Sequence, residues 1–217
     1  MKKRAGARPA GVKSAKKSAK KKVSRMAAGS RSAAAGRRKK AAPRPAAAPP
    51  SHDEMMAMWS RAMTPGDGHR RLEPLIGTFH ARTTFLMEPN APPSVSEGVS
   101  ENRWVLGGRY LEQTYKGSSM GMPFEGLGYT GFDNAQGKYV GTWMDTFGTG
   151  LMNSVGTGRP TDRKLTSRAE AVDPSGRVIN FECIVEIQDQ DHHTWEMWTR
   201  APSGKRYRAM QAEYTRK

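Results

Sequence analysis

Residues 177–188 read RVINFECIVEIQ, and apolar and polar side chains alternate along them. A period of two is typical of a β-strand with one buried and one solvent-facing side. The apolar side would carry Ile179, Phe181, Cys183, Val185 and Ile187, and the polar side would carry Asn180, Glu182, Glu186 and Gln188. Because a shift of one residue in register would turn the apolar set outward, this stretch decides which side of its sheet faces the core.

Nine similar β-rich runs lie between Gly77 and Lys217. They cover residues 77–87, 95–106, 108–116, 123–132, 138–146, 149–157, 164–172, 192–200 and 205–215. Turn-forming Gly, Asn, Asp and Pro residues separate them, and such short connections join antiparallel neighbours, because parallel strands need crossovers of a dozen or more residues. A closed sheet has no unpaired edge, so we predict a mainly β, antiparallel up-and-down barrel of about ten strands in residues 77–217.

A helical lead-in is expected over residues 51–76. Ser51 and Glu54 have the spacing of a capping box at a helix start. The apolar residues that follow at helical spacing are Met55, Met58, Trp59, Ala62 and Met63. We expect this helix to plug one end of the barrel with its apolar face.

Residues 1–50 carry 17 Lys or Arg and no acidic residue, whereas the rest of the chain carries 19 basic and 20 acidic residues. The segment has no aromatic residue, so ordering it would bury too little apolar surface to offset the lost entropy, and we predict a disordered tail. It resembles histone-like tails in composition and would attract nucleic acid without sequence preference. The candidate contacts are Lys16, Lys17, Lys20, Lys21, Lys22, Arg37, Arg38, Lys39 and Lys40. The alternative is a solubilising extension or a misassigned start, with translation beginning at Met26 or Met55.

The single cysteine, Cys183, excludes an internal disulfide and favours a reducing compartment. No apolar run approaches the roughly 18 residues that a membrane helix requires. We therefore expect a cytoplasmic protein, with the nucleoid as an alternative location, and no membrane partner.

Several stretches resemble the bacterial "domain of unknown function 1579" family. They read NRWVLGGRYLEQ at 102–113, GMPFEG at 121–126, GKYVGTWMD at 137–145 and EYTRK at 213–217. Residues 69–77, at the start of the domain, also resemble the family, and the resemblance covers about residues 66–217. It implies a lipocalin-like, calycin-type β-barrel and no established activity. Phe79 stands where the pattern has Trp, which in lipocalins packs at the closed end of the barrel, and Gln211 stands where Glu is usual.

Several motifs have structural explanations that we favour over catalytic ones. Residues 117–121 match G-x-S-x-G and residues 126–131 match G-x-G-x-x-G, but neither precedes a helix, as a nucleophile elbow or a dinucleotide site requires. The second set of glycines is better explained by close packing or strand coiling. His80 could serve as a haem or proton-transfer residue, although a strand histidine is more often packed or solvated. The turn with Asp189, Asp191, His192 and His193 could hold a metal, but it lacks any known ligand spacing, and a polar hairpin tip is the commoner explanation. We expect no cofactor.

The candidate ligand-binding residues occupy alternating positions on predicted strands. They are Trp104, Glu112, Tyr139, Trp143, Asp145, His193, Trp195 and Met197. If these faces point inward, they form an aromatic and thioether wall suited to a small, partly apolar molecule. A packed core around the tryptophans is the alternative. An inward Asp145 would need Arg103, Arg109 or a ligand as its partner, because an unpaired buried carboxylate is costly.

Three functions remain open from the sequence. The first is a non-enzymatic β-barrel that binds a small molecule. The second is an enzyme that uses Asp145, Glu112 and Glu196 as acid or base. The third is an interaction module with a packed barrel core, which a large exposed apolar patch would indicate.

Overall fold

The computed structural model of the protein describes residues 49–217. The predicted disorder of the tail and its nucleic-acid contacts lie outside the described residues. Two helices and a short 3-10 helix come first: α1 (His52–Met63), α2 (Asp67–Arg70) and η1 (Glu73–Leu75). Within the described part of the chain, no helix is both long and apolar enough to cross a membrane.

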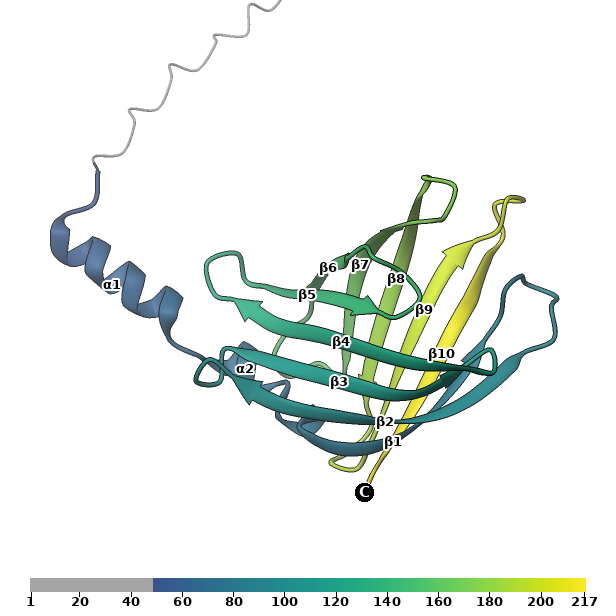
Figure 1. Ribbon diagram of the computed structural model, residues 1–217. Coiled ribbons are helices and arrows are strands. Elements are labelled where there is room, and N and C mark those ends of the chain that lie inside the picture. Colours follow the sequence, from purple (N-terminus) through teal and green to yellow (C-terminus); the bar gives the residue numbers. More distant parts are fainter. Residues whose placement is uncertain (1–48) are drawn as a thin grey trace, which may run out of the picture. The chain divides into compact units, whose positions relative to one another are not determined.

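Ten strands follow in the described residues and form one closed antiparallel barrel, as predicted (Figure 1). Each strand pairs with the next one in the chain, and β1 pairs with β10 to close the sheet. The strands are β1 (Gly77–Phe85), β2 (Ser94–Val105), β3 (Tyr110–Ser119), β4 (Met122–Asp133), β5 (Lys138–Asp145), β6 (Met152–Thr157), β7 (Lys164–Val172), β8 (Val178–Ile187), β9 (His192–Arg200) and β10 (Arg206–Arg216).

Strand register determines which side chains face the inside of the barrel. Phe79 on β1, fully buried, pairs with Ser100 on β2 and Arg216 on β10. Followed from strand to strand, the same register places Ile187, Cys183 and their alternate neighbours on the inner face of β8. The alternation predicted for residues 177–188 is therefore the inner and outer face of one barrel strand.

One end of the barrel is closed by a buried apolar cluster, and we call this the closed end. Its members are Leu72, Leu75, Leu111, Tyr139, Leu165 and Ile187, with Ile76, Trp104, Phe132 and Val185 packed against them. Leu72 and Leu75 come from the segment after α1, so residues 67–76 are the plug. The expectation that α1 plugs the barrel is wrong, because none of its residues is buried.

Arg216 joins the three segments that meet at the closed end. Its Nη1 donates to the carbonyl oxygen of Ile76 (2.7 Å), and its Nη2 donates to that of Pro74 (3.0 Å). Its Nε donates to the carbonyl oxygen of Gln190 (2.9 Å) in the turn between β8 and β9. The guanidinium also lies 4.6 Å from the centre of the Phe79 ring. One cation thus ties the lead-in to the first and last strands.

A buried polar chain lies beside this contact on the inner faces of β2 and β3. Asn102 donates to the carbonyl oxygen of Leu75 (2.7 Å) and accepts from the Ser100 hydroxyl (2.8 Å). The Gln113 amide donates to the same hydroxyl oxygen (2.8 Å). These bonds satisfy polar groups that would otherwise be costly inside the barrel, and they fix the plug to the wall.

Glycines allow aromatic rings to lie flat against the inner wall. A Cβ atom at Gly126 would come within 2.1 Å of the Trp143 ring, and one at Gly128 within 2.7 Å. A Cβ atom at Gly98 would come within 2.4 Å of the Tyr115 hydroxyl oxygen. The G-x-G-x-x-G stretch therefore contributes close packing, as the sequence indicated, and it keeps these rings near the wall.

We expect Arg216→Leu to lower the free energy of unfolding by about 3 kcal/mol, because it leaves several carbonyl groups at the closed end without a donor. Denaturant unfolding measures the change. Arg82→Leu is the matched control, since Arg82 forms an exposed pair with Glu213 at 3.4 Å and should contribute at most about 1 kcal/mol. Equal losses for the two variants would contradict the role given to Arg216.

Gly126→Ala should destabilise the protein by about 1–3 kcal/mol, because the new methyl group overlaps the Trp143 ring. The control is Gly150→Ala, where nothing lies within 4 Å of the added Cβ, and a change within about 0.5 kcal/mol is expected. Thermal and denaturant melts of both variants provide the comparison. A Gly126→Ala protein as stable as the control would show that Trp143 does not depend on this close approach.

Candidate functional site

The half of the barrel away from the plug has a partly accessible inner wall, and we call this the open half. Its inner face carries large side chains that are only half-buried, namely Phe85, Phe124, Trp143, Met152, Phe181, Trp195 and Met197. At the closed end, by contrast, Phe79 is fully buried and Leu111 is 4% exposed. Inner-face side chains of a closed barrel meet solvent chiefly within the lumen, so their exposure indicates free space there. A barrel of more than eight strands also exceeds the size that side chains readily fill.

Trp143 and Asp145 form a hydrogen-bonded pair near the rim of the open half. The indole Nε1 of Trp143 donates to Asp145 Oδ2 (2.9 Å), and the backbone N–H of Phe147 donates to Asp145 Oδ1 (2.9 Å). The expected arginine partners are elsewhere: Arg103 bonds to Glu112 and Arg109 to the carbonyl oxygen of Leu106. Asp145 is therefore held by neutral donors, and each carboxylate oxygen retains capacity to accept another bond.

Glu112 and Glu196 lie on the outer face, so the expectation that they line the lumen is corrected. Glu112 accepts from Arg103 (2.7 Å) and from the Tyr129 hydroxyl (2.9 Å), and these hydrogen bonds hold the pKa of its carboxyl below the ordinary value. Glu196 accepts from Trp198 Nε1 (2.9 Å) and Arg208 Nη1 (2.6 Å). Asp145 is the only carboxylate on the inner faces of the ten described strands.

His193 lies deeper in the barrel, between the rings of Tyr214 and Phe79. Its ring stacks on Tyr214 at 4.3 Å and meets the edge of Phe79 at 4.7 Å. Burial, assisted by the nearby positive charge of Arg216, lowers the pKa of His193 to about 4. The imidazole is therefore neutral at physiological pH. The side chain is only 6% exposed, and within residues 49–217 no hydrogen bond involves its ring nitrogens.

The remaining predicted site residues divide between the two ends. Trp104 is part of the closed end, where its Nε1 donates to Glu73 (2.9 Å). Tyr139 is also part of the closed-end cluster, and its hydroxyl has no hydrogen-bond partner in the described part of the chain. Trp195 and Met197 continue the inner face of β9 from His193 toward the open half. The structure thus brings Trp143, Asp145, Trp195 and Met197 to the open half.

An aromatic row that was not predicted from the sequence completes the wall. Phe124 on β4 contacts Tyr115 edge to face at 5.7 Å and Phe147 at 5.1 Å. Phe147 belongs to the loop after β5 and is 43% exposed. The alternation on β4 could have identified Phe124, but the position of Phe147 depends on the loop conformation.

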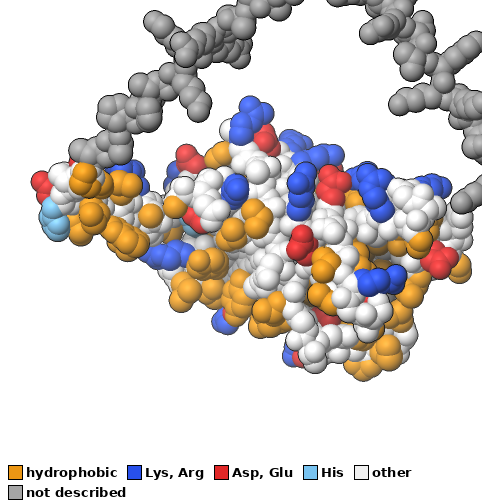
Figure 2. Space-filling model, turned by 90° about the horizontal axis from the view of Figure 1, so that it is seen from above, with side chains coloured by type: hydrophobic (Ala, Val, Ile, Leu, Met, Phe, Trp, Pro, Cys, Tyr) orange, Lys and Arg blue, Asp and Glu red, His pale blue; other side chains and the backbone are white. Residues whose placement is uncertain are grey.

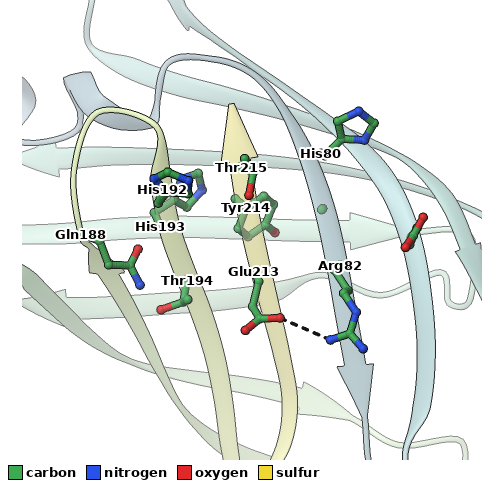
Figure 3. A pocket seen from close by; sticks show the side chains of 11 residues that line it. His80, Arg82, Gln188, His192, His193, Thr194, Glu213, Tyr214 and Thr215 are labelled. Atoms are coloured by element: carbon green, nitrogen blue, oxygen red, sulfur yellow. Dashed lines mark hydrogen bonds and ion pairs between the residues drawn. The ribbon is translucent and has the colours of Figure 1, made fainter. Parts of the chain in front are cut away.

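A groove of about 460 Å³ lies over β1, β9 and β10 (Figure 3). Arg82 and Glu213 face each other there, and the exposed His80 and His192 lie along it. His192 Nδ1 bonds to Asp189 Oδ1 of the same turn (2.9 Å), as expected for a polar hairpin tip. Among the described residues, no three potential metal ligands of the His, Cys, Asp or Glu type cluster together. The half-buried inner wall makes the lumen the candidate ligand site.

The barrel resembles solved structures at the level of fold. The crystal structure of Rv2717c from M. tuberculosis matches with a TM-score of 0.55 and 18% identity, covering 71% of this chain and 99% of that one. A redesigned β-barrel matches at 12% identity, covering 70% of this chain and 96% of that one, with a TM-score of 0.36, too low to support an argument. No curated protein matches the chain by sequence.

The family comparison covers the whole barrel and agrees with the resemblance found in the sequence. The model of the family described as "Protein of unknown function (DUF1579)" matches residues 64–216, which include the plug and all ten described strands. The chain therefore belongs to the DUF1579 family.

Proposed function

We propose that the barrel binds a small, partly apolar molecule in the open half of its lumen, without catalysing a reaction. The observation that carries this proposal is the half-buried state of large inner-face side chains there, whereas Leu72, Leu75 and Leu111 are buried at the closed end. A wall of aromatic and thioether groups with few polar atoms is the usual composition of a small-molecule pocket. The lipocalin-like character implied by the sequence would fit this role.

Asp145 and His193 would give the pocket its polarity. Asp145 offers a negative charge near the rim, held by Trp143 and Phe147. His193 offers a neutral imidazole at greater depth. A ligand with an apolar body and a hydrogen-bond donor or positive charge at one end would complement this arrangement, because charge-assisted bonds are stronger than neutral ones.

The position of the carboxylates favours binding over catalysis. General acid–base chemistry with paired carboxylates needs both groups near one reacting centre. Glu112 and Glu196 are engaged by arginines on the outer face, which leaves Asp145 without a second inner carboxylate. The packed-core alternative is disfavoured by the exposure of Trp143, Trp195 and Met197, which a filled lumen would bury.

Ser154→Phe should weaken binding of the neutral dye Nile red by at least ~10-fold, or ~1.4 kcal/mol, because the added ring fills the lumen. Ser154 faces the inside of β6, opposite Gly141 and Ala169. Fluorescence titration of the full chain measures the affinity. The matched control is Val155→Phe on the outer face of the same strand, where Val155 is 50% exposed, and its affinity should stay within about twofold.

Native mass spectrometry of the protein purified from its own source tests the same proposal without a dye. We expect a co-purifying small molecule that is lost on Ser154→Phe and kept on Val155→Phe. Repeated recovery of empty protein, together with no dye binding by the natural chain, would argue for a packed lumen instead.

Stability should fall as the pH is lowered from 6.5 to about 4, because His193 resists protonation in the folded state. The unfolded chain, with an ordinary histidine pKa of 6.5, binds more protons in this window than the folded chain, whose His193 has a pKa of about 4. The loss amounts to about 3 kcal/mol across the window. His193→Phe keeps the ring and removes the titration, so its free energy of unfolding should depend less on pH between 6.5 and 4.5. If the free energy of unfolding depends on pH equally in both proteins, the lowered pKa of His193 is contradicted.

A further inference from the structure

We propose that α1, together with the basic segment before it, docks on the surface of a lipid bilayer containing anionic lipids. The apolar face of α1 would enter the headgroup region, and the lysines and arginines of residues 1–50 would contact the lipid phosphates. This inference is independent of the proposed ligand in the lumen.

α1 has the means to form without support from the barrel. The backbone N–H of Ser51 donates to Glu54 Oε2 (2.8 Å), and the backbone N–H of Glu54 donates to Ser51 Oγ (3.3 Å). This is the capping box predicted from the sequence, and it satisfies backbone donors at the helix start. The helix nevertheless buries none of its residues.

The unburied apolar side chains share one face of α1. At 100° per residue they fall within an arc of about 160°, with Ser60, Asp53, Arg61 and Glu54 on the opposite side. Their exposed fractions are 45% for Met55, 54% for Met56, 54% for Met58, 59% for Trp59 and 54% for Met63. Figure 2 shows hydrophobic side chains, in orange, gathered along the helix at the left of the view. A contiguous apolar face of this kind marks an interaction surface.

The C-terminal end of α1 is attached to the barrel by Asn134, in the turn between β4 and β5. Its Nδ2 lies 2.7 Å from the carbonyl oxygen of Thr64, 3.1 Å from that of Arg61 and 3.3 Å from that of Ala62. These contacts use the unpaired carbonyls of a helix end. The attachment therefore involves backbone atoms and leaves the apolar face available.

The charge next to α1 decides among possible partners. Residues 1–50 bring 17 positive charges and no negative charge directly before the helix. Nucleic acid would take up this charge but would leave the apolar face in water. A second copy could cover the apolar face, but it would bring another equally positive segment close to the first. An anionic bilayer would neutralise the positive charge and also bury the apolar face. At a lipid surface the contributions of basic residues and of an apolar helix face add together.

The proposal concerns the membrane surface only and replaces the expectation of no membrane partner. A helix of 12 residues is about 18 Å long, whereas crossing the hydrocarbon core takes about 30 Å.

The test is flotation of the full chain with vesicles of phosphatidylcholine containing about one-third phosphatidylglycerol, at physiological salt. We expect binding to these vesicles and little binding to pure phosphatidylcholine vesicles. The triple variant Met55→Gln, Met58→Gln and Trp59→Gln keeps the charge and a good helix former, and it should bind at least about tenfold more weakly. The control is Ala57→Gln with Ser60→Gln on the opposite face, which should bind as the natural chain does. Melting temperatures of all variants should agree, because α1 buries no residue.

Several outcomes would overturn the proposal. Equal vesicle binding by the triple variant would assign the attraction to charge alone. Binding of a double-stranded oligonucleotide without binding of anionic vesicles would assign the basic segment to nucleic acid. Sedimentation showing a dimer that the triple variant converts to a monomer would assign the apolar face to a second copy.

Discussion

The contact between Arg216 and the closed end of the barrel is the constraint on which the rest depends. A meander of strands closes only if its first and last strands meet in one register, and Phe79 pairs directly with Arg216 where they do. The guanidinium lies over that phenyl ring and donates to carbonyls of the plug and of the turn between β8 and β9. Because side chains alternate around the whole sheet, this one register decides which half of them faces the lumen.

The closed end also determines how the remaining interior is used. Leu72 and Leu75 fill the space between the strands at one end, so the core needed for stability is concentrated there. At the other end, Gly126 and Gly128 let the ring of Trp143 lie along the wall. A side chain that lies along a wall contributes apolar surface without occupying the centre. The buried core is therefore concentrated at one end of the barrel, and the accessible inner wall lies at the other.

Much of this arrangement could be predicted from the sequence, and the failures have identifiable reasons. The alternation in residues 177–188 and the short turns were sufficient to predict the barrel, because both are local signals in the sequence. Glu196 stands between Trp195 and Met197, so strand alternation alone should have placed it on the outer face. The packing of Trp143 on Gly126 joins two strands, and no local pattern shows it.

The amphipathic spacing of α1 identified an apolar face, but a local pattern does not show what covers that face. The barrel is filled instead by the shorter segment that carries Leu72 and Leu75.

The two proposed activities place different demands on the barrel and lie at opposite ends of it. Asn134, which holds the end of α1, follows β4 at the end closed by Phe132 and Tyr139. Asp145, at the far end of β5, lies near the rim of the open half. A surface contact made through α1 would therefore leave the entrance near Asp145 open.

Charged groups are paired differently on the two faces of the wall. On the outer face, Glu112, Glu182 and Glu196 are each paired with an arginine. Asp145 and His193, on the inner face, lack a charged hydrogen-bond partner among the described residues. Asp145 and His193 thus place polar atoms inside the barrel, beside the accessible apolar wall.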